Sequence, residues 1–199
     1  FKACLFLGAG SVMHAMGGVI DMTRFSGLKK LMPITHATFL IGCIALAGVP
    51  PLAGFWSKDA ILGACHDLVH EGGSNASAYQ TLYYMGLLTA LLTAFYTFRA
   101  YFLTFRGEER IPPEAGHHAH ESPMAMAVPL IVLAVAAVVV GGLFHDSLPA
   151  FLLATPSLAI AKLKATAQPG VFHGDVAMIS TIVALAGIGA AAYLYLGDR

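Results

Sequence analysis

Charged residues are what this sequence has least of. Only 11% of its 199 residues are Asp, Glu, Lys or Arg, whereas a soluble domain carries about 25%. Hydrophobic residues reach 57%. This composition leaves too few polar side chains to cover a water-soluble fold, and it excludes a disordered chain, which needs low hydrophobicity and high net charge. The surface is therefore expected to face lipid.

The sequence also lacks an excess of either charge sign. Lys and Arg together number 11, as do Asp and Glu, so no basic surplus indicates a nucleic-acid partner. The chain opens on Phe1 without the basic and apolar pattern of a signal segment. We expect it to be an internal piece of a longer membrane protein.

Motifs for redox chemistry are missing as well. The three cysteines, Cys4, Cys43 and Cys65, stand apart in apolar surroundings and form no CxxC pair. There is no clustered cysteine set for an iron–sulfur centre, no haem motif and no glycine fingerprint for a dinucleotide. We expect no cofactor and no metal site in this chain.

Five stretches of low charge approach or exceed the length of about 20 residues that spans a bilayer. They predict an all-α, polytopic membrane helix bundle, forming a single membrane domain over residues 1–199. The predicted spans lie near residues 1–19, 33–69, 79–105, 123–144 and 176–197.

The second stretch is too long for one straight helix. At 1.5 Å per residue it would reach about 55 Å, against a hydrocarbon core of about 30 Å. Pro50 and Pro51, flanked by Gly48 and Gly54, predict the interruption, because proline removes a backbone donor and glycine permits unusual dihedrals. Free backbone groups in a membrane must be buried or line a wet cavity, so the break suggests a permeation path. The alternative is a kink that only packs.

Basic residues in the predicted loops suggest that the loops after the first, third and fifth spans face the cytoplasm. Positive residues favour the cytoplasmic side, and six lie in the loops after the first, third and fifth spans, against two on the other side. The six are Arg24, Lys29, Lys30, Arg106, Arg110 and Arg199, and the two are Lys162 and Lys164.

Lys58 and Asp59 follow the break directly, after 27 residues without a charge. A charge at mid-bilayer costs about 2.5–3.5 kcal/mol on insertion scales, so it is usually paired, hydrated or functional. Neighbouring helix positions do not face each other, so the two side chains are expected to have different partners. The alternative is a pair at a helix end whose charges reach the headgroups.

Lys2 and His14 are further candidates for carrying a proton. A helix that starts with Lys2 at the midplane would reach the interface about ten residues later, near Val12. An amine held out of water releases its proton more readily, and histidine titrates near neutrality. The alternative for Lys2 is a lysine in water, which fits the sequence equally well if the protein really starts at Phe1. Other histidines are interpreted as packing or interface residues, and the group formed with Glu121 as a solvated loop: His36, His66, His70, His117, His118 and His120.

Several segments resemble the large antiporter-like subunit, L or chain 5, of respiratory complex I, the NADH:quinone oxidoreductase. The similarity runs over about residues 1–145 and is most specific around Lys2 and over residues 48–59. The segments are FKACLFLGAGSVMHA at 1–15, DMTRFSGL at 21–28, MPIT at 32–35, ALAGVPPLAGFWSKD at 45–59, TAFYTFR at 93–99 and HESP at 120–123.

This resemblance implies roles for individual residues. Lys2 would be the central lysine of a proton path on one discontinuous helix, and Lys58 the terminal lysine on a second, beside Asp59. The chain would form the C-terminal half of a multi-pass subunit in the cell inner membrane, in contact with the other membrane-arm and peripheral subunits. NADH, FMN, iron–sulfur clusters and quinone are expected in those partners, so the chain would be part of an oxidoreductase without a redox centre of its own.

Two other functions stay open at this point. A subunit of a multi-subunit sodium–proton antiporter shares the same lysine helices. A non-conducting membrane scaffold, in which Lys58 and Asp59 only fix helix packing, is the second alternative.

Overall fold

The computed structural model describes residues 1–70, 73–145, 147, 151 and 172–196, and over these residues the chain forms helices and no β-strand. The predicted all-α membrane helix bundle is confirmed. Its elements are α1 (Lys2–Ala15), α2 (Pro33–Ala47), α3 (Ala53–His70), α4 (Ala76–Phe105), the 3-10 turn η1 (Pro113–His118), α5 (Met124–Phe144) and α8 (Gly174–Tyr195).

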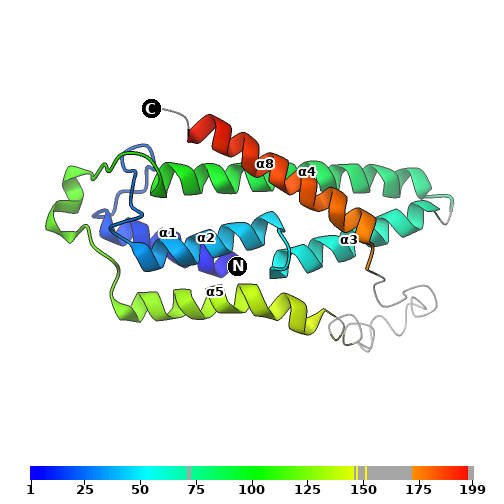
Figure 1. Cartoon of the computed structure of the whole chain (residues 1–199), viewed down its shortest axis with the longest axis horizontal. Helices are drawn as coiled ribbons and strands as arrows, with labels where there is room; N and C mark the ends of the chain where they lie inside the picture. Colours follow the sequence, from blue (N-terminus) through cyan, green and yellow to red (C-terminus); the bar gives the residue numbers. More distant parts are fainter. Residues whose placement is uncertain (71–72, 146, 148–150, 152–171, 197–199) are drawn as a thin grey trace.

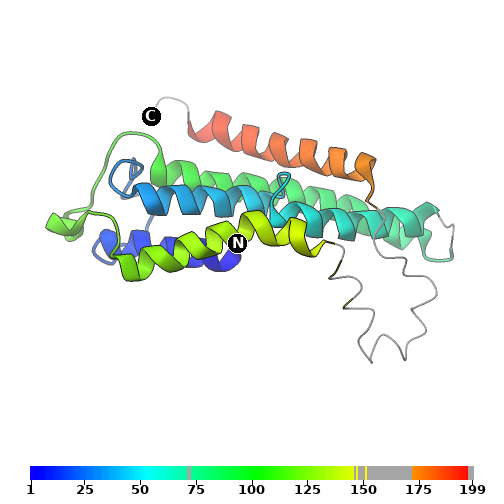
Figure 2. The same ribbon diagram turned by 60° about the horizontal axis from the view of Figure 1, so that its bottom comes forward.

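The helices run roughly along the long axis of the molecule (Figures 1 and 2). Helices α2 and α3 follow one another along this axis, and the 30-residue α4 runs back and packs against both. Helix α5 packs against α1, α2 and α3, while α8 lies mainly on α4. The N-terminus lies partway along the bundle in both views, so α1 extends from there toward one end only.

The predicted interruption at Pro50 and Pro51 is confirmed, because α2 ends at Ala47 and α3 begins at Ala53. Three described helices, α4, α5 and α8, are long and apolar enough to cross a membrane, while α2 has only 15 residues. The number of about five crossings stays a prediction.

Small residues allow the helices to approach closely. A Cβ at Gly187 of α8 would lie 2.6 Å from the carbonyl oxygen of Leu91 in α4. Close backbone approach at glycine is typical of helix pairs in membranes. Beside this contact, a core of buried apolar and aromatic side chains joins α1, α2, α4 and α8, and its largest fully buried side chains are Met16, Leu28, Met32, Tyr101 and Phe105.

The exterior of the bundle is apolar. Phe6 is 80% exposed and Leu143 69% exposed, and many other large apolar side chains lie outside the core. Exposed apolar surface of this extent indicates contact with lipid or with other membrane helices.

The two connecting segments, residues 16–32 and 106–123, meet at one end of the bundle. The backbones of Ser26 and Arg110 pair through two hydrogen bonds of 3.2 and 3.0 Å. Arg24 Nη2 donates a 2.6 Å hydrogen bond to Glu114 Oε1, which holds the pKa of Glu114 below its ordinary value. Five of the six basic residues predicted to share one side are in these loops. Arg199, Lys162 and Lys164 lie outside the described residues.

Candidate functional site

The break between α2 and α3 leaves a helix end inside the bundle. Gly48 ends α2 in the left-handed conformation, with φ of 84°, and its N–H donates to the Ala45 carbonyl at 3.1 Å. Val49 N–H donates to the Ile44 carbonyl at 3.3 Å. The last carbonyls of a helix have no partner within it, so those of Leu46 and Ala47 are available to a donor from elsewhere.

Lys58 supplies that donor. Its ammonium nitrogen Nζ donates to the carbonyl oxygens of Leu46 at 3.0 Å and Ala47 at 2.7 Å. A cation at a helix C-terminus is favoured by the partial negative charge of the terminal carbonyls. The half-buried Lys58 side chain therefore runs from α3 to the C-terminal end of α2, and its charge lies at the break between the two helices.

Two glycines make room for this arrangement. A Cβ at Gly48 would lie 2.7 Å from Lys58 Cδ, and a Cβ at Gly54 would lie 1.9 Å from the Ala45 carbonyl oxygen. Both distances are shorter than any real contact, so the lysine stem and the start of α3 fit only against a backbone without side chains at these positions. The glycines flanking the prolines thus position Lys58.

Asp59 is buried on another face of α3, as expected for a neighbour of Lys58. It is 4% exposed, and its Oδ1 has no hydrogen-bond partner among the described residues. A buried carboxylate oxygen without a partner is costly, because the group has lost its hydration. Asp59 is therefore a site at which a proton, a water molecule or a group from another chain would be stabilised.

The structure does not join Lys2 or His14 to this centre. Lys2 is the first residue of α1 and His14 lies in its last turn, and both are exposed. Neither side chain makes a hydrogen bond or an ion pair with any residue in the described part of the chain. Their predicted roles stay predictions.

A second polar cluster, which the sequence analysis did not identify, lies at the start of α2. The Glu121 carboxylate accepts hydrogen bonds from Ile34 N–H at 2.7 Å and from the Thr35 hydroxyl at 2.6 Å. Thr35 is also 3.0 Å from the buried hydroxyl of Ser11 in α1, which in turn contacts the hydroxyl of Ser122. Glu121 lies in a loop, as predicted, but its carboxylate is half-buried rather than simply solvated, because it satisfies free N–H groups at the N-terminus of α2.

Replacing Glu121 tests this contact. Glu121→Ala removes the acceptor for the first turn of α2, and loss of such a cap costs about 0.5–2 kcal/mol. We expect a lower midpoint of thermal unfolding in the purified full-length assembly, and a smaller decrease for Glu121→Gln, which keeps one acceptor oxygen. Equal midpoints for wild type and Glu121→Ala would show that the cap contributes nothing. Glu108→Ala, in the exposed loop before η1, is the control.

Comparison with known proteins places these residues in a family. The family model described as NADH:quinone oxidoreductase/Mrp antiporter, transmembrane, matches residues 1–72, which include Lys2, Lys58 and Asp59. The chain is 46% identical over 167 residues to NAD(P)H-quinone oxidoreductase chain 5 of Picosynechococcus sp., covering 71% of this chain and 24% of that protein.

Two further relatives carry the name NADH-quinone oxidoreductase subunit L. The protein of Mycobacterium tuberculosis is 48% identical over 143 residues, covering 72% of this chain and 21% of that protein. The protein of Rickettsia bellii is 36% identical over 211 residues, covering 100% of this chain and 29% of that protein. The chain thus spans between a fifth and a third of the length of these relatives. It belongs to the family of antiporter-like membrane subunits that comprises NADH-quinone oxidoreductase subunit L and chain 5.

Proposed function

We propose that this chain is part of a proton-translocating membrane subunit of an NADH:quinone oxidoreductase, and that Lys58 carries a proton at the helix break. The observation that carries the proposal is the pair of hydrogen bonds from Lys58 Nζ to the last carbonyls of α2. A titratable amine at a broken membrane helix is typical of ion paths. Membership of the family supports the same function.

In the proposed mechanism Lys58 alternates between two states. As an ammonium group it donates to the Leu46 and Ala47 carbonyls, and the terminal dipole of α2 stabilises its charge. After losing its proton, the neutral amine is no longer stabilised by this charge interaction. Asp59, buried beside it with a free oxygen, would exchange a proton with the path or provide a fixed counter-charge. Lys2 and His14 would act earlier in the same path, together with helices of the longer protein.

One nearby charge can supply the free energy needed to move a proton against the membrane potential. Moving a proton against 100 mV costs about 2.3 kcal/mol. A unit charge 4 Å away contributes about 4 kcal/mol at an effective dielectric constant of about 20. A single counter-charge that approaches or leaves Lys58 would therefore suffice to drive uptake and release of its proton.

The partners follow from the same proposal. The subunit would lie in the bacterial inner membrane as a multi-pass protein, in contact with other membrane-arm and peripheral subunits. NADH, FMN, iron–sulfur clusters and quinone would bind to those partner subunits, where the electron transfer takes place. This chain would contribute proton movement to the oxidoreductase.

Transport measured with and without sodium separates this function from sodium–proton antiport. We expect the full-length complex in proteoliposomes to acidify the lumen during NADH oxidation by quinone at the same rate with and without Na⁺. The rate is read from a pH-sensitive dye, and an uncoupler provides the zero level. Acidification that requires Na⁺ on one side would favour the antiporter function instead.

A further inference from the structure

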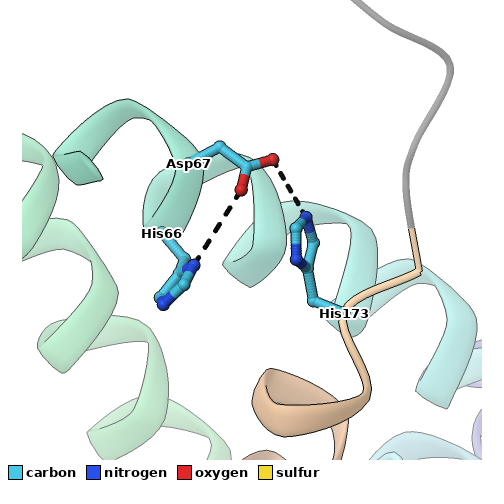
Figure 3. A group of neighbouring side chains, drawn as sticks. All are labelled: His66, Asp67 and His173. Carbon is cyan, nitrogen blue, oxygen red and sulfur yellow. Dashed lines mark hydrogen bonds and ion pairs between the residues drawn. The ribbon is translucent and has the colours of Figure 1, made fainter. Parts of the chain in front are cut away.

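A cluster of metal-ligand side chains lies at the end of the bundle opposite the basic loops. His66 and Asp67 are in the last turns of α3, and His173 directly precedes α8. In Figure 3 the two imidazole rings lie on either side of the Asp67 carboxylate, and each faces one of its oxygens. The cluster joins two helices that are more than a hundred residues apart in the sequence.

The ligand atoms are close enough to share one ion. His173 Nε2 is 3.0 Å from Asp67 Oδ2, and His66 Nδ1 is 3.9 Å from Asp67 Oδ1. One ligand atom from each of the three residues lies within 4.8 Å of the others. Ligands around a tetrahedral zinc ion, at about 2.0 Å from the metal, are about 3.3 Å apart. His66 would have to move closer to Asp67 for both to bind the same ion.

His66 has the features of a metal ligand. Its Nδ1 is buried and makes no hydrogen bond with any described residue. Its other nitrogen, Nε2, lies 3.2 Å from His70 Nε2 and 3.9 Å from Asp175 Oδ2. A metal-bound histidine usually has such a partner for its second nitrogen, which fixes the ring orientation.

We infer that His66, Asp67 and His173 form a binding site for a divalent transition metal of the zinc type, which ties α3 to the start of α8. Two imidazoles and one carboxylate suit Zn²⁺, and three protein ligands leave one position for water. The side chains are 29%, 48% and 21% exposed, so an ion can enter from the aqueous side. Binding would replace the hydrogen bond between His173 and Asp67 by two bonds to the metal.

Metal content measures the site directly and does not depend on the role of Lys58. The full-length complex is dialysed against a chelator and then equilibrated with Zn²⁺, and bound zinc is counted by mass spectrometry. We expect His66→Gln and His173→Gln to bind one equivalent less than wild type. His120→Gln, which removes an exposed histidine in the segment between η1 and α5, is expected to bind as much as wild type.

A second measurement covers the case in which the glutamine variants do not assemble. His173→Cys keeps a metal ligand at this position, so with Co²⁺ it is expected to bind one equivalent and to show thiolate-to-cobalt charge-transfer absorption in the difference spectrum. Equal zinc in wild type and His173→Gln would overturn the inference. So would the absence of the charge-transfer band in an assembled His173→Cys complex.

Discussion

Lys58→Met in the full-length protein is expected to leave the complex assembled and to lower proton translocation through this subunit by about 100-fold or more. Methionine fills a similar volume but has no proton to transfer and cannot donate to the Leu46 and Ala47 carbonyls. A positioned acid–base group contributes about 10²–10⁴-fold to proton transfer. The measurement is lumen acidification in proteoliposomes during NADH oxidation.

A neighbouring variant separates this effect from disturbance of the helix. Ser57→Ala changes an exposed side chain whose hydroxyl contacts only carbonyls of its own helix, Ala53 at 3.5 Å and Gly54 at 3.3 Å. We expect it to translocate protons at the wild-type rate. Normal acidification by assembled Lys58→Met would support the scaffold function, in which the lysine only holds two half-helices together.

Gly54→Ala is expected to have the second large effect, on assembly. The added Cβ would lie 1.9 Å from the Ala45 carbonyl oxygen. Because this oxygen belongs to the backbone, the end of α2 and the start of α3 must move apart, and overpacking of this kind costs about 1–3 kcal/mol or more. We expect less assembled complex in the membrane and a lower midpoint of thermal unfolding. Proton translocation falls too, since Lys58 lies one turn further along α3.

Gly189→Ala is the matched control for this prediction. Gly189 lies within α8, and a Cβ there would meet nothing within 4 Å. Alanine is favoured over glycine in a helix interior by about 1 kcal/mol, so this variant is expected to be as stable as wild type or more so. A Gly54→Ala complex with the wild-type unfolding midpoint would contradict the close approach of the two half-helices.

The break and its lysine could be predicted from the sequence because local chemistry determines them. Pro50 and Pro51 interrupt a helix through their own backbone chemistry, and a charged residue such as Lys58 is conspicuous in an apolar span before any of its neighbours is known. The apolar composition predicted a membrane bundle for the same reason. Each of these inferences needs only residues that are close together in the chain.

The partners of the polar side chains could not be predicted in this way. Lys58 bonds to carbonyls that every residue possesses, so no side-chain pattern marks them. Glu121 reaches the start of α2 across 87 positions, and His173 meets Asp67 across 106. Such contacts depend on how α3, α5 and α8 pack, and periodicity within one helix carries no information about its neighbours.

The roles of Lys2 and His14 stay predictions, because no contact in the described part of the chain joins either side chain to Lys58. Both residues lie on exposed positions of α1. Exposed polar groups on a membrane helix require partners from other helices or water.

Lys58→Arg tests most directly whether release of the proton, rather than the positive charge, matters. Arginine keeps a cation that can donate to the terminal carbonyls of α2, but it stays protonated in proteins. We therefore predict an assembled complex whose lumen acidification is as low as that of Lys58→Met. Acidification by Lys58→Arg at the wild-type rate would contradict the account, because a permanently charged group at the break would then serve as well as one that gives up its proton.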